Sequence, residues 1–120
     1  MRGFFKKLFS TPYRNLSANQ VITKLDNGWK PFIIDVRSHG EANGSGKVRG
    51  CKIVQPHFNI LKIRRKIPKE GDILLYCAGG MRSSKAIYTL IDSGIEAERL
   101  VNVRGGYRAY SSSGGKTSRR

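Results

Sequence analysis

A short apolar run, residues 73–76, meets a helix-like pattern at residue 83 through a loop that contains two glycines. The run has the length of a buried strand and follows a Gly-Asp turn signal. Apolar residues then recur at helical spacing over residues 83–92, and Gly94 ends the pattern. Parallel strands need crossover connections, usually helices, so this strand–loop–helix unit predicts an α/β fold.

Other segments of the chain repeat the alternation. The predicted strands cover residues 13–16, 31–36, 51–54, 73–76 and 100–103, and the predicted helices cover residues 17–26, 58–63 and 83–92. We expect a long polar connection over residues 38–50. These elements predict a parallel sheet covered by helices on both faces, with a ligand site beyond the carboxyl ends of its strands.

The length of 120 residues suits one domain, since single domains commonly span about 100–150 residues. We expect a basic amphipathic leader over residues 1–12, a domain over residues 13–110 and a flexible basic tail over residues 111–120. The apolar face of the leader is too short for a secretory signal, and no segment approaches the ~20 apolar residues of a membrane span.

The chain is strongly basic, with 23 Lys and Arg against 8 Asp and Glu and a formal charge of +15. Such a charge attracts anions and acidic protein surfaces. It is equally compatible with a solvated basic face and with a docking surface for an acidic protein or RNA, and the leader could touch an anionic membrane surface. Two cysteines cannot form a disulfide framework, so we expect a reducing compartment, the cytoplasm.

Cys77 is the main candidate for chemistry because it stands where the 73–76 strand ends and the glycine loop begins. Backbone N–H groups at a loop and helix N-terminus stabilise a thiolate, and Gly79 and Gly80 let them approach closely. Arg82 adds a fixed positive charge. The alternative is an inert buried cysteine at the end of a strand. Asp35 with Arg37 and Asn102 with Arg104 lie at the carboxyl ends of two other predicted strands and are expected to converge on this edge of the sheet.

Four segments, in order, resemble the single-domain rhodanese-like sulfurtransferases. Residues 77–83, Cys-Ala-Gly-Gly-Met-Arg-Ser, are similar to the Cys-x-x-Gly-x-Arg-Ser/Thr active-site loop of that family. The other three are Asp35-Val36-Arg37, Gly46-Lys47-Val48-Arg49-Gly50-Cys51 and Gly105-Gly106-Tyr107. Lys47 and Cys51 replace the family's usual His and Ala.

The resemblance implies a rhodanese fold, a central five-stranded parallel sheet flanked by helices on both faces. It also implies that the Cys77 thiolate takes sulfur from a small anionic donor such as thiosulfate, holds it as a persulfide, and passes it to cyanide, a thiol or an acidic sulfur-carrier protein. Asp35 and Arg37 are expected to give structural support, and no metal or organic cofactor is expected. The residues expected to bind the substrate are Ala78, Gly79, Gly80, Met81, Arg82 and Ser83.

Two other functions remain open. A non-catalytic rhodanese-like module would bind or regulate a partner through its basic surface. A phosphatase or arsenate-reductase-like enzyme would use the same cysteine, although the loop of the related phosphatases is one residue longer, which favours sulfur transfer here. Cys51 could be a resolving thiol or a small core residue, and His39 and His57 show no metal-ligand spacing.

Overall fold

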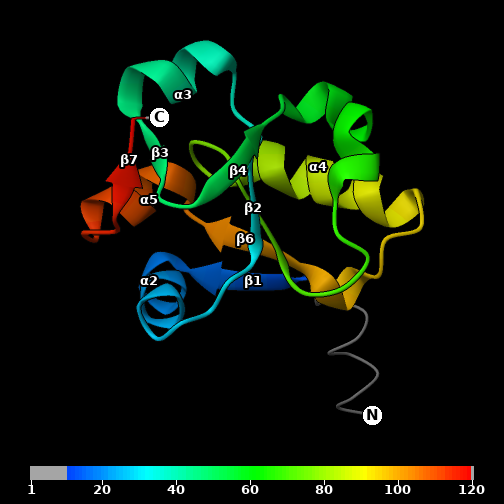
Figure 1. Ribbon diagram of the computed structural model, residues 1–120, viewed down its shortest axis with the longest axis horizontal. Coiled ribbons are helices and arrows are strands. Elements are labelled where there is room, and N and C mark those ends of the chain that lie inside the picture. The colour runs from blue at the N-terminus through cyan, green and yellow to red at the C-terminus, as the bar shows by residue number, and fades with distance from the viewer. Residues whose placement is uncertain (1–10, 120) are drawn as a thin grey trace.

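A computed structural model describes residues 11–119 of the chain. Its main sheet has five strands in the order β1-β6-β5-β2-β4, and all neighbouring pairs are parallel (Figure 1). The strands of this sheet are β1 (Arg14–Ser17), β2 (Phe32–Asp35), β4 (Cys51–Val54), β5 (Ile73–Tyr76) and β6 (Leu100–Arg104). The helices are α2 (Ala18–Asp26), α3 (His39–Ser45), α4 (Met81–Asp92) and α5 (Gly106–Ser112), with 3₁₀ segments η1 (His57–Lys66) and η2 (Ala97–Arg99). The predicted parallel five-stranded α/β fold is confirmed.

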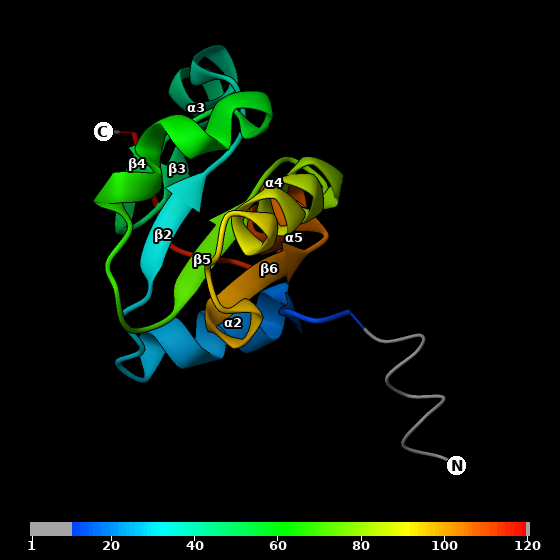
Figure 2. The ribbon, with the colours of Figure 1, turned by 90° about the vertical axis from the view of Figure 1, so that its right-hand side faces the viewer.

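Strand β5 lies in the middle of the sheet and is buried along its whole length. Successive side chains of a strand point to opposite faces, so Ile73 and Leu75 enter one core and Leu74 and Tyr76 the other. Helices η1 and α4 cover the first core, and α2 and α5 cover the second. Figure 2 shows these two helical layers on either side of the sheet.

Local sequence signals place several elements where they were predicted. Ser17 caps α2 by accepting a hydrogen bond from the Gln20 N–H, and the Gln20 side chain accepts one from Ser17 in return. Strand β5 has the predicted bounds, and α4 begins two residues before the predicted residue 83. Segment η1 is longer than the helix predicted over residues 58–63 and is kinked at Asn59.

The prediction of a long polar connection over residues 38–50 is wrong. This segment contains α3 and the short strand β3 (Lys47–Val48). Ser38 and Glu41 form a second capping box at the start of α3. Glycines within α3 interrupt its apolar pattern, so periodicity alone did not reveal the helix. Helix α3 carries Glu41, whose carboxylate contacts Arg82 of the Cys77 loop.

The prediction of a flexible tail over residues 111–120 is also wrong for the part of it that the structure describes. Helix α5 continues to Ser112, and strand β7 (Thr117–Ser118) pairs antiparallel with β3. The Tyr110 hydroxyl donates to the Lys116 carbonyl oxygen at 2.6 Å, which holds the turn between α5 and β7. Pairing with β3 orders this segment, so it adopts regular structure without an apolar periodicity of its own. Most of the predicted leader, residues 1–10, lies outside the described residues.

Over residues 11–119, no helix is long and apolar enough to cross a membrane.

Candidate active site

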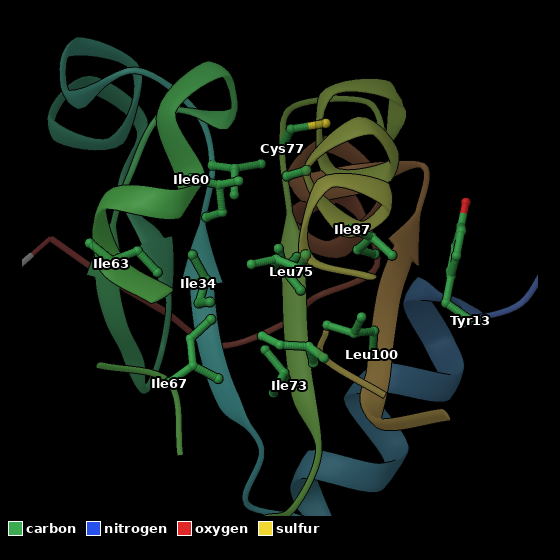
Figure 3. Packing of buried hydrophobic residues seen from close by; sticks show 14 residues of the cluster. Tyr13, Ile34, Ile60, Ile63, Ile67, Ile73, Leu75, Cys77, Ile87 and Leu100 are labelled. Atoms are coloured by element: carbon green, nitrogen blue, oxygen red, sulfur yellow. The ribbon is translucent and has the colours of Figure 1, made fainter. Parts of the chain in front are cut away.

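Cys77 directly follows β5, and its side chain lies on the face of the sheet covered by α4 (Figure 3). Gly80 then takes the left-handed conformation, with φ of 108°, and caps the start of α4. This turn brings the Gly80 N–H to 3.0 Å from the Cys77 Sγ, where it donates to the sulfur. A residue with a Cβ is strained at that φ, which explains the glycine.

The loop favours the ionised form of Cys77. Burial is the largest single effect and opposes ionisation, but donation from Ser83 and from the backbone N–H groups of Ser83, Gly80 and Gly79 outweighs it. The pKa of the Cys77 thiol therefore lies below its ordinary value. A thiolate is the reactive form of a cysteine, so the predicted anionic sulfur is chemically reasonable at this position.

The Ser83 hydroxyl links Cys77 to a polar chain behind the loop. Its Oγ lies 3.4 Å from the Cys77 Sγ and donates to the Asn102 Oδ1 at 2.6 Å. Asn102 in turn donates to the Asn15 Oδ1 at 3.0 Å. The same Oγ lies 3.1 Å from the Gly80 carbonyl oxygen. A hydroxyl carries one proton, so Ser83 donates to only one of Cys77, Asn102 and Gly80 at a time.

Helix α5 holds the first residues of the loop from the other side. The Tyr107 N–H donates to the Cys77 carbonyl oxygen at 2.8 Å, and the Arg108 N–H donates to that of Ala78 at 3.2 Å. Gly106 permits this approach, because a Cβ there would lie 2.5 Å from the Ala78 carbonyl carbon. The Gly-Gly-aromatic segment thus fixes the carbonyl groups of the loop.

Arg82 does not point freely into the loop. Its two Nη atoms donate to the two carboxylate oxygens of Glu41 at 2.7 and 2.8 Å. Both side chains are about one third exposed. The Arg82 hydrogen bonds are the main reason that the pKa of Glu41 falls to about 2. An incoming anion must compete with Glu41 for this guanidinium.

Asp35 and Arg37 form a buried ion pair, in which the Arg37 Nη2 lies 2.7 Å from the Asp35 Oδ2. Arg37 also donates to the Ser45 Oγ and to the Gly46 carbonyl oxygen. Its guanidinium carbon lies 4.2 Å from the centre of the Tyr107 ring. All of these contacts tie β2 to the end of α3 and to α5.

The Cys77 residue is only 1% exposed, so the atoms around the sulfur must move before a reagent reaches it. Two of its neighbours in the loop, Gly79 and Met81, are exposed. Arg104, which was expected near the loop, is exposed at the end of β6. Cys51 and Cys77 are both free thiols, and residues 11–119 contain no group of three or more His, Cys, Asp or Glu side chains suited to a metal ion.

Comparisons with known proteins agree with the fold. Residues 17–113 match the protein family whose description is "Rhodanese-like domain". The chain belongs to the rhodanese-like family. A sulfurtransferase from Allochromatium vinosum is 31% identical over 84 residues, which cover 69% of this chain and 74% of that protein.

Two solved structures show the same rhodanese-like fold. The rhodanese-like domain of an Anabaena protein superposes with a TM-score of 0.76 at 26% identity, covering 91% of this chain and 80% of that one. A protein of unknown function from Rhodopseudomonas palustris, described as a possible tyrosine phosphatase, gives a TM-score of 0.76 at 25% identity, covering 88% of this chain and 85% of that one.

Sequence reasoning singled out Cys77 in this rhodanese-like domain but missed two polar residues near its loop, Glu41 and Asn15. Glu41 was overlooked because its segment was predicted to be a loop, although the Ser38-x-x-Glu41 capping pattern was a usable signal. Asn15 lies 87 positions from Asn102, and nothing local in the sequence pairs them.

Proposed function

We propose that this protein is a sulfurtransferase that carries sulfane sulfur as a persulfide on Cys77. The supporting observation is the Gly80 N–H, which donates to the Cys77 Sγ at 3.0 Å. Together with the neighbouring amides it lowers the pKa of the thiol despite burial. The membership of the rhodanese-like family and the sulfurtransferase relative support the same reaction class.

In the proposed reaction, the Cys77 thiolate attacks the outer sulfur of thiosulfate. The sulfur–sulfur bond of thiosulfate breaks, its electron pair leaves with sulfite, and Cys77 becomes a persulfide anion. Attack of cyanide on the terminal sulfur then releases thiocyanate and restores the thiolate; a thiol acceptor instead becomes a persulfide itself. The proposed roles of the loop are to donate N–H groups to the terminal sulfur and to bind the anionic donor with Arg82.

Glu41 gives this proposal a testable feature. A donor that binds Arg82 displaces a carboxylate already held by two hydrogen bonds. We therefore expect the best sulfur donors to be small anions, whose negative charge takes the place of the Glu41 carboxylate beside Arg82. The basic surface also suits an acidic carrier protein as acceptor, and two free thiols suit the cytoplasm.

Intact-protein mass spectrometry tests the proposal directly. Incubation with thiosulfate is expected to add about 32 Da, one sulfur atom, to the protein and to its Cys51→Ser variant. Cys77→Ser is expected to add nothing. If several sulfane donors leave the wild-type protein unmodified, or if the adduct survives in Cys77→Ser, the proposal fails.

A non-catalytic binding module is the second candidate, and the burial of Cys77 favours it. This alternative predicts no adduct and no sulfur transfer with any donor. The likeness to a possible tyrosine phosphatase suggests a third assay, hydrolysis of para-nitrophenyl phosphate. Turnover that disappears in Cys77→Ser would support phosphate chemistry in place of sulfur transfer.

A further inference from the structure

A second concave site lies far from the Cys77 loop. It is a cavity of about 550 Å³ between α2, the start of β2 and the segment that joins α5 to β7. Strands β2 and β5 run parallel, and the cavity lies at their amino ends while Cys77 lies at the carboxyl ends. Figure 1 shows α2, α5 and β7 on the same side of the molecule. The two sites therefore use opposite ends of the sheet.

The inner wall of this cavity is apolar. Ile33 and Tyr110 are buried in the core beneath it, and Ile22, Leu25 and Trp29 are only half-buried. Hydrogen bonding fixes the Trp29 ring, because its Nε1–H donates to the Asp72 Oδ2 at 2.6 Å. Partly exposed apolar side chains around a rigid hollow are typical of sites for small molecules, and the volume lies within their usual range of about 300–1,000 Å³.

The rim of the cavity is cationic. Lys30, Arg49, Lys52 and Lys116 line it, against the one carboxylate of Asp26. Lys116 lies 3.9 Å from Asp26, while no carboxylate within residues 11–119 pairs with Lys30, Arg49 or Lys52. Three cations without partners around an apolar hollow favour a ligand that brings its own negative charge.

We infer that this cavity binds a small amphipathic organic anion. The apolar body of the ligand would lie on Ile22, Leu25 and Trp29, and its carboxylate or phosphate head would meet Arg49, Lys30 or Lys52. The site requires no contact with Cys77, so it is independent of sulfur transfer. A charged head distinguishes this class from neutral apolar compounds, which would leave the cations unpaired.

Trp29 is the chain's one tryptophan, so its fluorescence reports directly on the cavity. Titration of the full chain with octanoate or with monooctyl phosphate is expected to shift the Trp29 emission and to saturate. Comparison of the two anions identifies the preferred head group. We expect 1-octanol, which has the same tail without a charge, to bind at least tenfold more weakly.

Charge-reversal variants locate the binding site. Arg49→Glu combined with Lys52→Glu is expected to raise the Kd of the tighter anion at least tenfold. Both side chains are exposed, and neither forms an ion pair within residues 11–119, so the fold is expected to persist. Lys62→Glu with Lys66→Glu changes the net charge equally on η1 and is expected to change Kd less than twofold.

Several results would overturn the inference. The titration could fail to saturate with either anion, 1-octanol could bind as tightly as the anions, or the two pairs of charge reversals could weaken binding equally. Loss of binding in Cys77→Ser would also overturn it, because the anion would then occupy the other site.

Discussion

Arg82 and Glu41 lie 41 positions apart and form a paired, two-bond contact beside the Cys77 loop. One partner comes from the first turn of α3 and the other from the first turn of α4. The pair neutralises the cation that the loop sequence supplies. Its removal should therefore change how the loop binds anions while the fold stays intact.

Glu41→Gln removes this competing charge. We expect the KM for thiosulfate to fall roughly threefold or more, because the donor no longer displaces a carboxylate from Arg82, and stability to change by less than about 1 kcal/mol. Steady-state kinetics and thermal unfolding measure both effects. Glu96→Gln, which breaks the surface pair with Arg99, is the matched control. An unchanged KM in both variants would show that Arg82 does not bind the donor.

The ionisation of Glu41 reports on the same pair. Its pKa is lowered from 4.5 to about 2, mainly by the Arg82 hydrogen bonds, and Ser38 adds to the effect. A lowered pKa in the folded state stabilises the fold fully above 4.5 and less as the pH falls toward 2. Since the side chains are about one third exposed, solvent screening keeps this contribution small.

Carboxyl NMR titration of Glu41 is therefore expected to show a pKa well below that of an unpaired glutamate. In Arg82→Gln the pKa should rise toward its ordinary value, with the Ser38 hydrogen bonds retained. A Glu41 pKa that is the same in both proteins would contradict the ion pair.

Ser83→Ala tests whether the hydroxyl stabilises the thiolate. We expect the pKa of Cys77 to rise and its alkylation by iodoacetamide at pH 7 to slow by roughly tenfold or more, since a hydrogen bond to a charged group contributes about 1.5–3 kcal/mol. The measurement uses a Cys51→Ala background, so that only Cys77 reacts. Ser84→Ala is the control, because Ser84 contacts the Tyr13 hydroxyl instead. Equal rates in all three proteins would show that the Ser83 hydroxyl donates to Asn102 or to the Gly80 carbonyl oxygen and not to the Cys77 sulfur.

Gly106→Ala should displace the loop. Its Cβ would lie 2.5 Å from the Ala78 carbonyl oxygen, at a φ of 64° that already disfavours side chains. We expect roughly 3 kcal/mol of destabilisation in urea unfolding and a loss of persulfide formation. Gly71→Ala has a similar strain, with φ of 92°, but open space around it, and should cost about 1–2 kcal/mol with the loop intact. Equal costs would show that the close approach is relaxed easily.

Arg37→Met should be among the most destabilising changes in the chain. It leaves the buried Asp35 carboxylate without its ion-pair partner, which typically costs about 3–5 kcal/mol. Adding Asp35→Asn removes the uncompensated charge and is expected to restore part of this stability in chemical unfolding. If the double variant is less stable than the Arg37→Met single variant, the pair is not the dominant interaction there.

Local sequence determined the central unit of this protein. The apolar run of β5, the left-handed Gly80 and the helical period of α4 act between near neighbours, so they place Cys77 at a strand end without reference to other segments. The same holds for the Ser17 capping box. The parallel five-stranded sheet followed from the alternation of such units.

Tertiary structure alone decided how the loop is completed. Glu41 reaches Arg82, and Asn15 reaches Asn102, only after strands distant in the sequence have packed side by side. The order of the C-terminal segment likewise depends on pairing of β7 with β3. Such contacts produce no periodic pattern in the sequence. The partner of each polar side chain is set by how whole helices and strands pack, and not by neighbouring residues in the chain.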